Sequence, residues 1–174
     1  MPFCTRCALV GLAFFALALA GCDSSNPGRD LAAVDGIYAL EVLTFDPVTQ
    51  GLPTADVGAR LDRPNSTLEI FGGDGDALFR IRYLDGLLGT SRVNFTVGAA
   101  GGRVALEATD TGDRDDLAAI LLPPSFALTY DGNSPRVLEG TFDLSGVNLE
   151  AFDPATYQDQ RSNRGTLTVR FRRP

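Results

Sequence analysis

The stretch from Ser91 to Val97 reads Ser-Arg-Val-Asn-Phe-Thr-Val and alternates polar and apolar side chains with a period of two. Successive side chains of a β-strand point to opposite faces, so Val93, Phe95 and Val97 share one face and the polar residues share the other. A strand with one apolar face is typical of an antiparallel sheet that packs one side on a core and exposes the other to water. This segment therefore decides the fold class.

The same alternation recurs in both directions along the chain. It predicts eight strands, at residues 36–44, 66–71, 76–84, 91–97, 103–108, 125–130, 136–144 and 166–172, with a weaker ninth at 57–61. Segments rich in Gly, Asp or Asn at 72–75, 98–102 and 131–135 separate three consecutive strand pairs and are typical of hairpin turns. Two short helices are expected, at residues 113–121 with an acidic first turn and at 153–157, where Asp precedes Pro. We therefore predict an all-β domain, an antiparallel meander of about eight or nine strands that forms a closed barrel or a two-layer sandwich.

The N-terminal residues carry a different pattern. A continuous apolar run from Ala8 to Ala20 follows one charge, Arg6, and is about as long as the apolar part of a signal peptide. It ends in Leu19-Ala20-Gly21-Cys22, which resembles the lipobox of bacterial lipoproteins. The resemblance implies that signal peptidase II cuts between Gly21 and Cys22 and that the Cys22 sulfur carries a diacylglycerol. The alternatives are an ordinary secretory signal with a chance Cys and a short membrane anchor.

This reading divides the chain into three parts. Residues 1–21 form a lipoprotein signal peptide, residues 22–34 a lipidated Cys with a flexible tether, and residues 35–174 a single β domain. Asp23, directly after the lipid Cys, resembles an inner-membrane retention signal in enteric bacteria and a surface-export signal in other lineages. We therefore expect a lipid anchor in a bacterial cell envelope, with the choice of inner or outer membrane left open.

Composition excludes several kinds of chemistry. The chain has no His, Lys or Trp, and its three Cys all lie in the first 22 residues. Without His there is no usual catalytic triad and no imidazole metal site, and without Lys there is no Schiff base and no Walker-type phosphate loop. The net charge of −7 opposes nucleic-acid binding. We expect no enzymatic activity, no cofactor and no metal.

The acidic and basic clusters of the sequence are explained more simply by structural roles than by metal-binding or catalytic sites. The segment 72–78 resembles a calcium-binding nonapeptide repeat, but it is one residue short and occurs once, so a glycine-rich turn is favoured. Four carboxylates in 110–116 fit a helix cap and a solvated loop. Glutamates at 69, 107 and 139 fall on the polar faces of strands, unlike a sequestered general acid of a glycosidase. Outward arginines at 80, 82, 92, 103, 170 and 172 need no anionic partner to explain them, because Arg is the only basic residue type available to balance the 22 acids.

One resemblance concerns the β domain itself. Asp35-Gly36-Ile37-Tyr38 is similar to the Gly-x-Trp signature of lipocalins, with Tyr in place of Trp, and Arg170 or Arg172 is similar to their closing arginine. The resemblance implies a lipocalin-like or calycin-like barrel with an interior ligand. A ligand cavity would then be lined by the inward residues Tyr38, Leu40, Phe79, Tyr83, Phe95, Phe126, Phe142 and Phe171.

Two functions follow from these patterns. The first is an envelope lipoprotein whose non-enzymatic β domain binds a protein partner or has a structural role. The alternative is a lipocalin-like carrier of a small apolar ligand. They differ in the barrel interior, because a carrier needs an open cavity among the inward aromatic residues, whereas rings that interdigitate would fill it.

Overall fold

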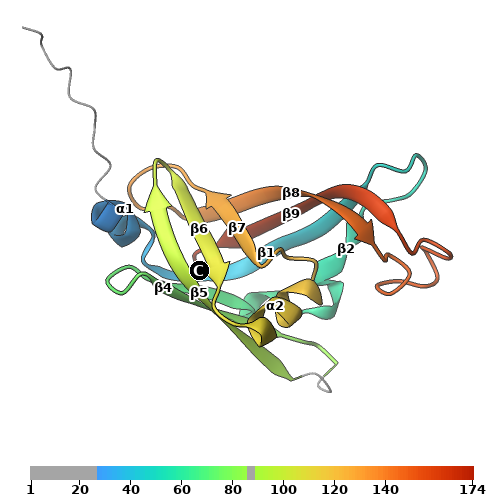
Figure 1. Ribbon diagram of the computed structural model, residues 1–174, viewed down its shortest axis with the longest axis horizontal. Coiled ribbons are helices and arrows are strands. Elements are labelled where there is room, and N and C mark those ends of the chain that lie inside the picture. Colours follow the sequence, from blue (N-terminus) through green and yellow to red (C-terminus); the bar gives the residue numbers. More distant parts are fainter. Residues whose placement is uncertain (1–26, 86–88) are drawn as a thin grey trace, which may run out of the picture.

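The computed structural model describes residues 27–85 and 89–174, which form an antiparallel sheet of nine strands (Figure 1). The strands are β1 (Gly36–Pro47), β2 (Ala55–Asp56), β3 (Thr67–Phe71), β4 (Asp76–Arg82), β5 (Thr90–Ala100), β6 (Arg103–Ala108), β7 (Ser125–Thr129), β8 (Val137–Val147) and β9 (Asn163–Arg172). The helices are α1 (Pro27–Val34) and α2 (Thr111–Ala118), with 3₁₀ turns η1 (Val57–Arg60) and η2 (Arg63–Asn65). Each strand from β3 to β8 pairs with the next along the chain, so the predicted meander is confirmed.

The sheet closes on itself through its first and last strands. β1 pairs with β3 on one side and with β9 on the other, from Ala39↔Arg172 to Pro47↔Gly165, which completes a barrel of eight strands. The two-residue strand β2 pairs with β1 as an extra strand. Of the two architectures expected, the chain therefore forms the barrel. Closure turns the apolar faces of the strands toward one interior and pairs the edges of β1 and β9, which an open sheet would leave exposed.

The prediction of a weaker ninth strand at residues 57–61 was wrong. Val57–Arg60 form η1, Leu61 makes one isolated bridge to Tyr83, and the extra strand is β2, just before η1. Val57 and Gly58 are buried, and the Arg63 Nε donates a hydrogen bond of 3.2 Å to the Gly58 carbonyl. This side-chain contact holds the backbone in a tight turn, so the alternation of residues 57–61 does not produce a strand.

Of the two predicted helices, one forms. α2 begins two residues earlier than expected, because the Asp110 carboxylate caps it by accepting a hydrogen bond of 2.8 Å from the Asp113 backbone N–H. The chain then continues through a turn in which Leu117, Ile120 and Leu122 are buried. Residues 153–157 form only one turn, closed by a 3.0 Å hydrogen bond from the Tyr157 N–H to the Asp153 carbonyl.

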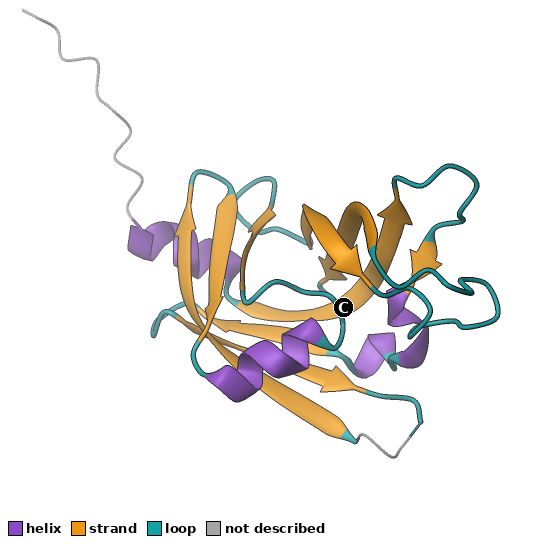
Figure 2. Cartoon of the chain, turned by 45° about the vertical axis from the view of Figure 1, so that its right-hand side comes forward, coloured by secondary structure: helices purple, strands orange, loops and turns teal. Residues whose placement is uncertain are grey.

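Helix α1 corrects the predicted tether, which we expected to continue through residue 34. Val34 is fully buried, Leu31 packs beside it against the core, and the Asp30 Oδ2 accepts a 3.2 Å hydrogen bond from the Gly101 backbone N–H. The short turns at 72–75, 101–102 and 131–136 lie at this end of the barrel, which we call the α1 end. The longer connections at 48–66, 109–124 and 148–162 lie at the opposite end, the α2 end (Figure 2).

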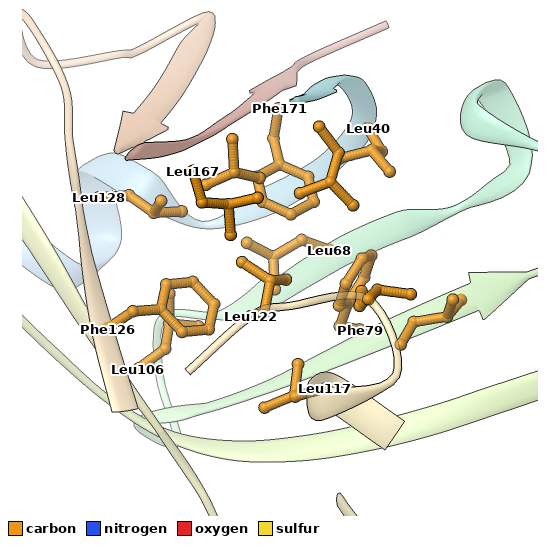
Figure 3. Close-up of a cluster of buried hydrophobic side chains, with 14 of the residues drawn as sticks. Leu40, Leu68, Phe79, Leu106, Leu117, Leu122, Phe126, Leu128, Leu167 and Phe171 are labelled. Carbon is orange, nitrogen blue, oxygen red and sulfur yellow. The ribbon is translucent and has the colours of Figure 1, made fainter. Parts of the chain in front are cut away.

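Aromatic rings pack edge to face across the barrel interior. The ring centroids of Phe79 and Phe171 lie 5.3 Å apart, and Phe126 lies 5.7 Å from both Phe95 and Phe142. Leu117 and Leu122, from the connection at the α2 end, belong to the same cluster (Figure 3). The core is therefore made by the strands and completed by the segment that follows α2.

A substitution at Gly165 tests how closely β1 and β9 approach. A Cβ on Gly165 would collide with the Asp46 carbonyl and lie 2.6 Å from the Phe45 ring, whereas a Cβ on Gly98 of β5 would meet nothing within 4 Å. We expect Gly165→Ala to lower the free energy of unfolding by about 1–3 kcal/mol through overpacking. Gly98→Ala is the matched control and should leave the urea midpoint unchanged or slightly raised. Equal midpoints for the two variants would contradict the close approach.

Candidate functional site

The eight residues proposed to line a ligand cavity all lie on the inner side of the barrel. Six are at most 6% exposed: Tyr38, Leu40, Phe79, Phe95, Phe126 and Phe171. Tyr83 and Phe142 are partly buried and pack against the same core. The structure therefore brings together residues from most of the barrel strands, as the alternation implied.

These side chains pack against one another. The edge-to-face contacts described above join Phe95, Phe126 and Phe142 in one row and Phe79 to Phe171 in another. Four hollows of about 280–420 Å³ can be described on the molecule, and of the eight residues only Leu40 lines one of them. A ligand inside the barrel would have to displace these rings. The ligand cavity proposed from the sequence therefore stays a prediction.

Arg173, the residue after β9, contacts the start of β1, while Arg170 and Arg172 form ion pairs with Glu139 and Glu41. The Arg173 guanidinium lies over the Tyr38 ring, 4.9 Å from the centroid, and its Nη2 donates hydrogen bonds to the Tyr38 hydroxyl (2.7 Å) and the Asp35 carbonyl (2.6 Å). The Tyr38 hydroxyl donates in turn to the Val34 carbonyl at 3.0 Å. We call this contact the Tyr38–Arg173 clasp, because it ties the start of β1 and the end of α1 to the last residues of the chain.

The local sequence explains the clasp. Gly36 has a φ of +136°, and a Cβ there would lie 3.1 Å from the Arg173 Nη2, so glycine leaves room for the guanidinium. Burial raises the pKa of the Tyr38 hydroxyl, while the hydrogen bond from Arg173 acts in the opposite direction. The ring is therefore neutral at ordinary pH and provides both a π face for the cation and a hydroxyl for hydrogen bonding.

Four of the six outward arginines named above, Arg80, Arg82, Arg170 and Arg172, form ion pairs along the barrel wall. Arg172 lies 2.9 Å from Glu41, Arg170 lies 3.0 Å from Glu139, and Arg80 lies 2.8 Å from Glu69. The Arg172 hydrogen bond holds the pKa of Glu41 below its usual value, and the Arg161 hydrogen bond does the same for Glu150. A carboxyl group that acts as a general acid needs a pKa raised above its usual value, which is the opposite shift.

The two acidic segments have structural roles. Residues 72–75 make the turn between β3 and β4, where a Cβ on Gly72 would lie 2.9 Å from the Leu31 carbonyl of α1. In the second segment, Asp110 caps α2 and the buried Asp113 accepts a 2.9 Å hydrogen bond from the Thr109 hydroxyl. Both observations agree with the turn and cap favoured from the sequence.

Gly21 and Cys22, which carry the lipobox, lie outside the described residues, as do Cys4 and Cys7. Within residues 27–85 and 89–174, no helix combines the length and apolar character that crossing a membrane would require. The lipid anchor therefore remains a proposal drawn from the sequence.

No protein-family model matches this chain, and no curated protein matches it. The closed eight-stranded meander is consistent with a lipocalin-like barrel. This likeness concerns the fold and not a function.

The clasp can be tested against an exposed ion pair on the same part of the chain. Arg173→Ala removes two hydrogen bonds and the cation–π contact and leaves the buried Tyr38 hydroxyl without its donor, so we expect a loss of about 1–3 kcal/mol in the free energy of unfolding. Arg170→Ala removes an exposed pair with Glu139 and should cost at most about 1 kcal/mol. Urea unfolding measures both, and a larger loss for Arg170→Ala would contradict the clasp.

Proposed function

We propose that this protein is a lipid-anchored lipoprotein of a bacterial envelope whose barrel binds a protein partner through its outer surface and does not catalyse a reaction. The edge-to-face packing of the Phe79, Phe95, Phe126, Phe142 and Phe171 rings carries the proposal. Because these rings occupy the interior, the surface available to a partner is the barrel wall and its two ends.

The position of α1 supports an anchored barrel. α1 begins at Pro27 and packs on the barrel, so only five steps of the chain separate it from Cys22. Fully extended, five residues reach about 17 Å. A lipid on Cys22 would therefore hold the α1 end near the membrane surface, and the α2 end and much of the wall would face away from it.

The carboxylates support a non-enzymatic role. Glu41, Glu69, Glu139 and Glu150 each lie within ion-pair distance of an arginine, at the surface of the barrel and not in a sequestered cleft. Neighbouring guanidinium groups favour the ionised form of a carboxyl. Acids held in this form are suited to fixing strands and loops to one another.

The alternative function is a carrier of a small apolar ligand, and the lipocalin-like fold favours it. The two functions differ in whether a ligand binds inside the barrel. We expect a fluorescent long-chain fatty acid to show no saturable binding to the native protein, because the rings exclude it. Phe79→Leu should behave like the native protein, and so should Phe71→Ser, which removes an exposed ring from the outer wall. Saturable one-to-one binding that Phe79→Leu alters and Phe71→Ser does not would establish the carrier instead.

The anchor has its own test. Cys22→Ser should leave an uncleaved precursor that incorporates no radiolabelled fatty acid, because the thiol is the group that takes the diacylglycerol. Cys7→Ser is the matched control and should be processed and labelled like the native chain. Fatty acid that still enters the Cys22→Ser protein would contradict the lipobox interpretation.

A further inference from the structure

A hollow on the outer wall lies where β1, η2 and the residues at the end of β9 meet. It has a volume of about 420 Å³, and the residues that line it are Ala39, Leu40, Glu41, Arg63, Pro64, Arg172, Arg173 and Pro174. We call it the β1–β9 hollow. Its volume lies within the range of small-molecule pockets, about 300–1,000 Å³.

The position of the β1–β9 hollow follows from the strand pairing. β3 pairs with β1 only as far as Ala39↔Thr67, and the chain before Thr67 turns through η2. The register of β1 against β9 shifts in the same place, between Leu40 and Val42. Most of the surface that lines the hollow is apolar, and Ala39, Pro64 and Pro174 contribute to it. An apolar side chain would therefore be sheltered from water there.

Arg173 brings to this hollow a charge that no carboxylate balances. Its Nη2 donates to two neutral groups, the Tyr38 hydroxyl and the Asp35 carbonyl. None of the ion pairs formed by residues 27–85 and 89–174 includes Arg173. Its Nη1 makes no hydrogen bond to the described residues and is open to solvent. A guanidinium in this condition is a strong hydrogen-bond donor for a carboxylate.

Arg172 can add a second donor. Its Nε donates a 2.9 Å hydrogen bond to the Glu41 Oε1, which fixes the position of the side chain. Its two Nη groups take part in no hydrogen bond within the described part of the chain, and the side chain is 52% exposed. An anion in the hollow could therefore bind Arg172 without breaking the pair with Glu41.

Two buried polar atoms of the lining residues lack hydrogen-bond partners. They are the Glu41 Oε2 and the Arg173 Nε, and the described residues contain no other buried side-chain atom in this condition. Such atoms are rare in folded proteins because an unpaired buried polar group is costly. The terminal torsion of a glutamate is broad, so the Glu41 Oε2 can turn toward a donor in the hollow. The hollow thus has a use for one hydrogen-bond donor and one acceptor.

These features select one chemical class of occupant. The last residue of a polypeptide carries a carboxylate, an amide N–H and a side chain on one Cα, so it offers an acceptor to Arg173, a donor to Glu41 and an apolar group to the walls. A fatty acid has the carboxylate but no donor for Glu41. An acidic residue inside a chain carries its carboxylate and its apolar neighbour on different residues.

We propose that the β1–β9 hollow binds the C-terminal residue of a partner protein, an apolar residue with a free carboxylate. This inference rests on the proposed function and names the partner-binding site. The hollow opens on the outer wall, so the rest of the partner chain can leave it toward solvent.

A set of synthetic peptides tests this assignment. The probe is a fluorescein-labelled peptide of five glycine and serine residues followed by a leucine with a free carboxylate. It is added to the purified full-length chain in mild detergent, and fluorescence anisotropy measures the Kd. We expect saturable binding that becomes about tenfold weaker when the carboxylate is replaced by an amide, because the charge-assisted hydrogen bonds are lost. A final serine in place of leucine should weaken binding about fivefold.

Variants of the chain locate the bound peptide. Arg172→Gln should weaken the carboxylate peptide about fivefold through the loss of a charged donor. The matched control is Arg170→Gln, which removes the 3.0 Å pair with Glu139 from the same strand but does not line the hollow, and it should leave binding unchanged. Ala39→Leu should also weaken binding, because the larger side chain takes up part of the hollow. Urea unfolding of each variant checks that it is folded.

Several results would overturn the proposal. Equal binding of the carboxylate and amide peptides would exclude recognition of the terminal charge, and equal effects of Arg172→Gln and Arg170→Gln would place the peptide elsewhere. Binding of N-acetyl-leucine without binding of the six-residue peptide would assign the hollow to a small molecule. A fatty acid whose binding Arg172→Gln weakens and Phe79→Leu does not would assign it to a lipid. Each failure leaves the labelling of Cys22 and the interior-binding test unaffected, so it does not count against the proposed function.

Discussion

β1 pairs with β9 from Ala39 to Pro47, so hydrogen bonds between the first and last long strands hold the barrel closed. The register shifts once, between Leu40 and Val42, where Glu41 is the extra residue and its carboxylate pairs with Arg172. The inward side chains share one volume only because this pairing exists. The edge-to-face rings, the burial of Leu117 and Leu122 and the position of Arg173 over Tyr38 all depend on it.

The strength of the wall is uneven around the barrel. β8 and β1 both pair with β9 over most of their length, whereas the backbone pairing of β7 with β8 is limited to one residue pair. Gly140 lies where the strands start to part, and a Cβ there would lie 3.0 Å from the Ala127 carbonyl. The side chains of Phe126 and Phe142 keep the interior covered beyond it. A well-packed core and an incompletely paired wall thus coexist, because side-chain contact can continue where backbone pairing stops.

Much of the fold could be predicted from the sequence, because a period of two is a local property and eight segments carry it. Contacts between distant residues could not be read in this way. Arg173 follows the alternating residues of β9, and its contact with Tyr38, 135 positions away, was not predicted. α1 was missed because its packing rests on Leu31 and Val34, too few apolar residues to show a helical period. The short pairing between β7 and β8 depends on where two strands diverge, which no local pattern records.

The closing strand lies at residues 163–172, and its partner β1 begins at residue 36. Their contact therefore has almost the largest sequence separation that the domain allows. Folding rates fall as contacts become more distant in sequence, because chain entropy is lost before such contacts stabilise the structure. The meander from β3 to β7 can assemble from neighbouring hairpins, but β1 gains this partner only when the ten residues of β9 arrive. Shortening the chain at that end would thus affect the whole barrel, and not one edge of it.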